Sequence, residues 1–220
     1  MVTVFDRLAN EYDQWFDSED GRPIFDAEIA CLKDLMPADL GRWLEVGVGT
    51  GRFAQGLGVK EGIDPSVPML EFARQRGVRT RTGWGEDLPY PDGSFDGVLL
   101  VVTLCFLSDP ATALRECARV LKEDGCLMVG LVPAGSPWAR LYKRKGRTGH
   151  PFYAVARFYD CDKVIRMADT AGFKLNRAVS CLFSPPGEPL DVSRRQGIVA
   201  GAGFVAMEFA NPGRSTGSPS

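Results

Sequence analysis

Three alternate glycines are the residues of this chain best suited to binding a ligand. Residues 44–51 read Leu-Glu-Val-Gly-Val-Gly-Thr-Gly, and a stretch that favours a helix follows them. Glycine lets the backbone approach a ligand closely, and the N–H groups that open a helix attract polar or anionic groups. Strand-to-helix turns also use glycine for geometry alone, but three glycines within five residues indicate a binding loop.

An aspartate ends the next apolar segment. Asp64 closes residues 59–64 and precedes Pro65. A carboxylate at this place can accept hydrogen bonds from both hydroxyls of a ribose, although it can also cap the following helix. NAD carries such a ribose too, so Asp64 predicts a nucleoside without identifying the cofactor.

Alternating strands and helices must position these residues. Apolar runs predict parallel strands at 42–48, 59–64, 95–102 and 126–133, and residues 78–81 could form one more. Helices are expected at 52–57, 65–76 and 109–121. A helix at 160–171 and two strands, 174–183 and 203–210, predict an antiparallel hairpin at the sheet edge. We therefore expect an α/β fold, Rossmann-like and doubly wound, with a mostly parallel seven-stranded sheet.

The 220 residues suit one domain, which we place at 1–210. Residues 1–36 are expected to form an N-terminal cap segment that includes a helix at 24–36. Residues 134–157 are polar and basic, and we expect them to form an irregular cap insert. The tail 211–220 is rich in Gly, Ser and Pro and is expected to be disordered.

Composition argues against several classes of protein. The net charge is −2, no apolar run is long enough for a membrane span, and no signal peptide is visible. The six cysteines form no CxxC pair and His150 is the only histidine, so we expect no metal and a cytoplasmic protein. The basic run 143–147 could bind phosphate, but such runs are usually solvated, and we expect no nucleic-acid partner.

Two further motifs carry a family resemblance. Glu45 followed by the three glycines resembles the first motif of class I S-adenosylmethionine-dependent methyltransferases. Residues 83–96, GWGEDLPYPDGSFD, resemble the GDAEDLPFPDGSFD stretch of the ubiquinone and menaquinone methyltransferase-like (type 11) group, and LKEDG at 121–125 resembles its LKPGG turn. The resemblance spans residues 42–133.

The resemblance implies that S-adenosylmethionine is the cofactor. The glycine loop would pack against its methionine part, Asp64 would hold the ribose, and the loop after the third strand would hold adenine. The expected cofactor-binding residues are Glu45, Gly47, Val48, Gly49, Gly51, Asp64, Pro65, Met69, Trp84, Gly85, Glu86 and Thr103.

Trp84 departs from the family pattern, which has Asp or Asn at this position. An indole can stack on adenine but cannot accept a hydrogen bond from the adenine amino group. Glu86 or the backbone at Gly85 would then have to accept it. Trp84 as an ordinary core residue remains an open alternative.

No general base stands at the usual place. Many relatives carry a histidine where this chain has Cys105 and Phe106. Methyl transfer from a sulfonium is a direct displacement that depends mainly on alignment and exclusion of water. We expect an acceptor that is already nucleophilic, an inert thiol at Cys105, and at most a weak case for His150 as a base.

Aromatic residues in the two cap pieces suggest a small-molecule acceptor that is apolar or planar. The expected acceptor pocket comprises Tyr12, Trp15, Cys105, Phe106, Trp138, Tyr142 and Tyr153, although the same rings could merely join cap to core. The sequence thus predicts S-adenosylmethionine-dependent methyl transfer. The alternatives are a cofactor-binding protein without turnover and an NAD(P)-dependent oxidoreductase, against which residues 83–96 and the C-terminal hairpin argue.

Overall fold

One eight-stranded sheet organises the protein in the computed structural model, which describes residues 3–211. Its strand order is β3-β2-β1-β4-β5-β8-β6-β7; β1 to β5 are parallel, and β8 is antiparallel to both β5 and β6. The strands are β1 (Trp43–Val46), β2 (Glu61–Asp64), β3 (Arg79–Thr82), β4 (Phe95–Val101), β5 (Leu121–Leu131), β6 (Lys174–Cys181), β7 (Arg195–Gln196) and β8 (Phe204–Ala210).

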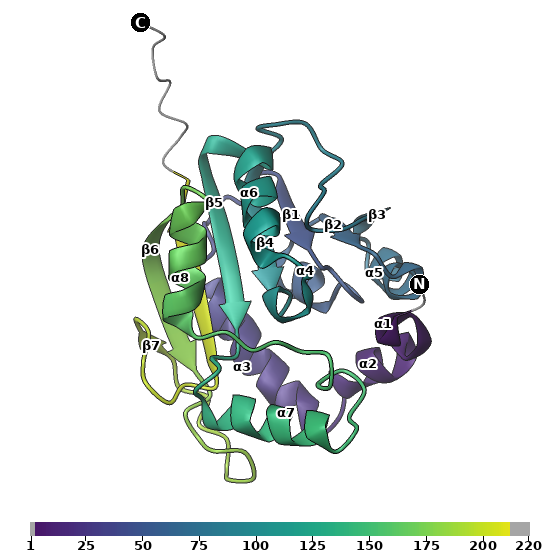
Figure 1. Cartoon of the computed structure of the whole chain (residues 1–220), viewed down its shortest axis with the longest axis vertical. Helices are drawn as coiled ribbons and strands as arrows, with labels where there is room; N and C mark the ends of the chain where they lie inside the picture. The colour runs from purple at the N-terminus through teal and green to yellow at the C-terminus, as the bar shows by residue number, and fades with distance from the viewer. Residues whose placement is uncertain (1–2, 212–220) are drawn as a thin grey trace, which may run out of the picture.

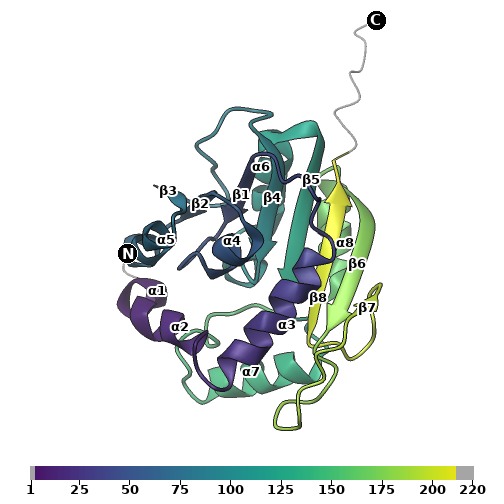
Figure 2. The same cartoon turned by 180° about the vertical axis from the view of Figure 1, so that it is seen from behind.

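Helices cover both faces of this sheet and its carboxyl end (Figures 1 and 2). They are α1 (Val4–Arg7), α2 (Ala9–Trp15), α3 (Gly21–Lys33), α4 (Arg52–Leu57), α5 (Val67–Gln75), the short 3-10 helix η1 (Leu104–Phe106), α6 (Pro110–Val120), α7 (Pro137–Arg147) and α8 (Cys161–Thr170). None of the helices in residues 3–211 is long and apolar enough to cross a membrane.

The C-terminal half of β4 is a continuous apolar run because both faces of the sheet are covered there. Along β4, Leu99 and Val101 belong to the core under α3, α4 and α5, whereas Val98 and Leu100 belong to the core under α6 and α8. Successive side chains of a strand point to opposite faces, so a continuous apolar run serves two cores at once. The predicted fold class is confirmed.

Two details of the fold prediction were wrong. The sheet has one strand more than the predicted seven, because Arg195 and Gln196 pair with Ser180 and Val179 of β6. The predicted irregular insert contains a helix, α7. Its start is capped by Ser136, whose hydroxyl accepts a hydrogen bond from Ala139 N, and the basic run 143–147 forms its C-terminal part.

The parallel strands direct their carboxyl ends toward α1, α2 and α7 (Figure 1). In open α/β sheets this end is where ligands bind. Helices α1 and α2 come from residues expected only to form a cap segment, and α3 packs against β6 and β8. Of the tail predicted to be disordered, residues 212–220 lie outside the described residues.

Candidate functional site

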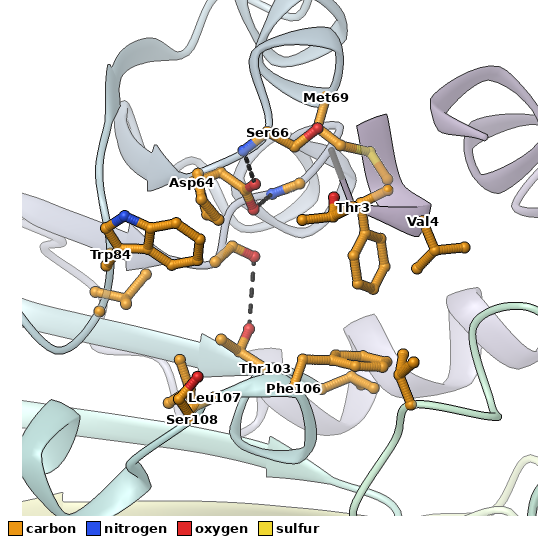
Figure 3. A pocket seen from close by; sticks show the side chains of 18 of the residues that line it. Thr3, Val4, Asp64, Ser66, Met69, Trp84, Thr103, Phe106, Leu107 and Ser108 are labelled. Atoms are coloured by element: carbon orange, nitrogen blue, oxygen red, sulfur yellow. Dashed lines mark hydrogen bonds between the residues drawn. The ribbon is translucent and has the colours of Figure 1, made fainter. Parts of the chain in front are cut away.

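A cavity of about 480 Å³ opens at the carboxyl end of the parallel strands (Figure 3). This volume lies within the range of small-molecule sites. Its walls come from the start of the chain, the glycine loop, the ends of β2, β3 and β4, and the segment after α7. The lining residues are Thr3, Val4, Phe5, Arg7, Tyr12, Val46, Gly47, Gly49, Asp64, Pro65, Ser66, Met69, Gly83, Trp84, Gly85, Glu86, Val101, Val102, Thr103, Phe106, Leu107, Ser108, Pro151 and Val155.

Asp64 is fixed by two backbone donors at this cavity. Gly49 N donates to Oδ2 and Ser66 N donates to Oδ1, each at 2.9 Å. Burial raises the pKa of Asp64 to about 6, although these two N–H groups favour the charged form. Each carboxylate oxygen can still accept another hydrogen bond, so the carboxylate can receive two hydroxyl groups.

The three loop glycines serve different purposes. A Cβ on Gly47, where φ is +72°, would lie 2.3 Å from Thr103 Cγ2, so Thr103 requires glycine there. A Cβ on Gly51 would lie 2.9 Å from Ala73 Cα, so this glycine lets the loop pack on α5. A Cβ on Gly49 would meet only Tyr12 Cε1, at 3.9 Å. Gly49 therefore leaves space toward the cavity.

Two residues predicted to bind cofactor build the loop rather than line the cavity. Glu45 is 1% exposed, and its Oε2 has no hydrogen-bond partner in the described part of the chain. Burial raises the pKa of Glu45 well above its usual range. Val48 is also buried and fills the space beside Gly62, whose added Cβ would lie 2.6 Å from Val48 Cγ2.

The third loop supplies one rim of the cavity. Trp84 is 58% exposed, so it is not the core residue that the open alternative envisaged. Glu86 Oε1 accepts hydrogen bonds from Ser108 N at 2.9 Å and Asp109 N at 3.1 Å, which ties this loop to the start of α6. Its other carboxylate oxygen is left for further donors.

Backbone strain marks the end of β4. Val102 has φ of +51°, which is unfavourable for a β-branched residue, and it lines the cavity. Cys105 donates its S–H to Val102 O at 3.1 Å, and burial raises the pKa of Cys105 to about 12. The neutral thiol suits a structural role better than a nucleophilic one.

The residues predicted for the acceptor pocket fall into two groups. Tyr12 and Phe106 line the cavity. The other five predicted residues do not line it; they are Trp15, Cys105, Trp138, Tyr142 and Tyr153. The indole of Trp138, for example, donates from Nε1 to Ser184 O at 2.9 Å. Tyr142 stacks on Tyr153 with ring centroids 4.4 Å apart, and Trp15 packs against Phe16.

His150 also lies outside the cavity lining. Its ring stacks on Tyr153, with centroids 4.2 Å apart, and its Nδ1 is buried with no partner in residues 3–211. Burial and the charge of Lys145 lower the pKa of His150. The neighbouring Pro151 and Val155 reach the cavity instead.

An aromatic cluster closes one end of the cavity. Phe5 contacts Phe106 and Phe152 at centroid distances of 5.0 and 5.3 Å, and Tyr12 contacts Phe152 at 5.3 Å. Phe5 and Phe152 belong to the two aromatic cap pieces that the sequence indicated for the acceptor pocket, whereas Ser66 was not predicted as a site residue. Ser66 follows Asp64 by two residues, a spacing typical of an Asx turn, and this was the available signal.

Ion pairs hold α2 against the glycine loop. Asp13 accepts hydrogen bonds from Arg52 Nε and Nη2, both at 2.9 Å, and from Arg76 Nη2 at 2.8 Å. Arg52 also pairs with Asp17. Arg52 begins α4, the helix that follows the three glycines, so this network fixes the N-terminal helices beside the cavity.

Comparison with known proteins agrees with this arrangement. The sequence model of a family described as "Methyltransferase domain" matches residues 44–129. A solved structure from Thermotoga maritima, described as a SAM-dependent methyltransferase and possible histamine N-methyltransferase, is 38% identical. It covers 94% of this chain and 98% of its own, with a TM-score of 0.87. The chain belongs to the class I S-adenosylmethionine-dependent methyltransferases.

Two further relatives are described only as uncharacterized proteins. An uncharacterized protein of Mycobacterium tuberculosis is 44% identical over 203 residues, which are 91% of this chain and 71% of the relative. An uncharacterized protein of Methanocaldococcus jannaschii is 37% identical over 206 residues, 94% of this chain and 98% of the relative. The similarity thus extends beyond the glycine-loop half to nearly the whole chain.

Proposed function

We propose that this chain transfers a methyl group from S-adenosylmethionine to a small-molecule acceptor. The observation that carries this proposal is Asp64, whose two oxygens are held by Gly49 and Ser66 at the wall of the cavity. A carboxylate fixed in this way is suited to the two hydroxyls of a ribose.

The other lining residues fit the remaining parts of the cofactor. Gly47 and Gly49 offer backbone at close range for the methionine part, and Met69 gives an apolar contact. The exposed indole of Trp84 can stack on adenine, while Oε2 of Glu86 can accept from the adenine amino group. These residues include most of the predicted set; Glu45, Val48 and Gly51 support the loop from behind.

Bound S-adenosylmethionine supplies an electrophilic methyl group. The chain's own task is to align the acceptor and exclude water, which the ring cluster of Phe5, Tyr12, Phe106 and Phe152 can do. The thiol of Cys105 is neutral and bonded to Val102 O. We therefore propose catalysis mainly by proximity and orientation.

A methyl-transfer assay tests this proposal against its alternatives. Purified protein is incubated with S-adenosylmethionine carrying a tritiated methyl group and a panel of small acceptors. Labelled product should form with at least one acceptor, and S-adenosylhomocysteine should accumulate in equal amount. If the cofactor raises the melting temperature but no acceptor is methylated, the protein is a cofactor binder without turnover. If only NAD or NADP raises the melting temperature, the proposal is overturned in favour of an oxidoreductase.

A further inference from the structure

One segment of the chain concentrates positive charge that the proposed methyl transfer does not use. Residues 125–159 hold six lysines and arginines and no aspartate or glutamate. The whole chain has 26 basic and 28 acidic residues, so the remainder has 20 basic and 28 acidic residues, an excess of eight negative charges. Such an asymmetry within a chain of nearly balanced charge indicates an anionic partner for the basic segment.

Helix α7 gathers most of this charge on one face. Four of its basic residues follow one another at spacings of three, one and three, which brings them to one side of a helix. They are Arg140, Lys143, Arg144 and Arg147. The opposite side carries Trp138, Ala139 and Tyr142, which are buried in the core. The apolar side of α7 is thus already packed, and its cationic face is turned outward.

No acidic side chain neutralises this cationic face. Within residues 3–211, none of its four cations forms an ion pair. Arg140 and Lys143 donate hydrogen bonds only to neutral backbone oxygens, at 2.7 and 2.9 Å. Arg144 and Arg147 are exposed, and their side chains make no hydrogen bond in the described part of the chain. The face therefore presents uncompensated positive charge to the solvent.

Exposed valines lie in the segments that adjoin α7. Val155 is 54% exposed and follows the helix, and Val192 is 53% exposed in the loop between β6 and β7. That loop is tied to α7 because Trp138 Nε1 donates to Ser184 O, and both Figure 1 and Figure 2 show it next to the helix. Cations attract lipid phosphates, and an aliphatic side chain gains free energy by entering the headgroup region. Nucleic acid would match the charge alone, so the combination favours a lipid surface.

We propose that the outer face of α7 docks on a membrane surface of anionic lipids. The four cations face the lipid phosphates, and the two valines enter the headgroup region. Val155 also lines the cavity, so the docked face adjoins the site described above. This inference goes beyond methyl transfer and does not depend on it, because lipid binding is measured without cofactor or acceptor.

Sedimentation with lipid vesicles tests the proposal. Purified protein is mixed with vesicles of phosphatidylcholine alone or of equal parts phosphatidylcholine and phosphatidylglycerol. Wild-type protein should bind the mixed vesicles and not the phosphatidylcholine vesicles, and added salt should weaken the binding because it screens exposed charges. The double variant Arg144→Gln, Arg147→Gln should bind about 30-fold more weakly, since each basic residue near an anionic surface contributes about fivefold.

A matched control removes the same charge elsewhere. The double variant Arg74→Gln, Arg166→Gln alters exposed arginines on α5 and α8 and should bind the mixed vesicles like wild type. Val192→Ser keeps every charge and should weaken binding by about threefold, because less apolar surface enters the headgroup region. A thermal melt of each variant shows that it is folded.

Three outcomes would overturn the proposal. The first is that wild-type protein does not bind the mixed vesicles. The second is that the two double variants lose the same affinity, which would make binding a matter of net charge and not of α7. The third is that a DNA duplex at equal phosphate concentration displaces the protein from the vesicles, which would make nucleic acid the better partner.

Discussion

At the scale of single residues, the site depends on glycines that a side chain would disrupt for different reasons. Gly47 and Gly93 both have positive φ, +72° and +64°, but only Gly47 faces a close neighbour. Its hydrogen is packed against Thr103 at the end of β4. The two glycines therefore separate the cost of backbone strain from the cost of filling the site.

We expect Gly47→Ala to destroy cofactor binding. The new methyl would lie 2.3 Å from Thr103 Cγ2, so the loop or β4 must move. Affinity for S-adenosylhomocysteine, measured by calorimetry, should fall at least tenfold, and the free energy of unfolding should fall by about 2 kcal/mol more than for the control.

Gly93→Ala is that control, because its Cβ would meet nothing within 4 Å. This substitution should lower the free energy of unfolding by about 1 kcal/mol, because alanine is strained at positive φ. It should leave the affinity for S-adenosylhomocysteine unchanged. Equal losses of affinity in the two variants would contradict the role assigned to the Gly47–Thr103 contact.

The residue types at the proposed nucleoside site were largely predictable, because glycine loops and Asp64 occupy fixed places after parallel strands. Which of these residues line the cavity and which support the loop from behind was not predictable. Glu45 belongs to the motif but is buried behind the loop, a position that depends on tertiary packing which the motif does not specify.

At the scale of elements, α2 is held in place by buried ion pairs in addition to the ring contacts of Tyr12 and Trp15. The side chains of Arg52 and Asp13 are 12% and 10% exposed. Removing one partner of such a pair leaves the other charge buried without a counter-charge, which destabilises the folded state. The ion pairs thus govern how firmly the N-terminal helices cover the cavity.

We expect Arg52→Met to loosen α2. Asp13 would keep only Arg76, and the free energy of unfolding should fall by about 3 kcal/mol. Hydrogen exchange of the α2 amides should accelerate, and dissociation of S-adenosylhomocysteine should become faster. Lys174→Met removes an exposed ion pair with Asp169, away from α2, and should change the free energy of unfolding by less than about 0.5 kcal/mol. Unchanged exchange in α2 would contradict this account.

Most of the order of strands and helices followed from the sequence because short apolar runs mark buried parallel strands such as β4. Helix α7 was not predicted from the sequence, because its basic residues dominate the local composition. Its start signal, Ser136 before Pro137, and its buried Trp138, Ala139 and Tyr142 show that tertiary packing stabilises it. The strand β7 has only two residues, too few for any periodic pattern.

At the scale of the whole molecule, the cavity exists only because distant segments meet at one end of the sheet. Thr3 to Tyr12, the loops after β1, β2 and β3, the turn after β4, and Pro151 to Val155 all contribute walls. Figure 3 shows the two sides, with Asp64, Ser66 and Met69 facing Thr103, Phe106 and Leu107 across the space. The central claim is that this space holds the cofactor through Asp64.

Calorimetric titration with S-adenosylhomocysteine, comparing wild type with Asp64→Ala, tests that claim most directly. Wild-type protein should bind one equivalent, and Asp64→Ala should bind about 10- to 100-fold more weakly, because hydrogen bonds to a charged group are lost. Asp169→Ala, which removes an exposed ion pair with Lys174 at the C-terminal end of α8, should bind like wild type. Absence of binding by wild type, or unchanged affinity in Asp64→Ala, would contradict the account.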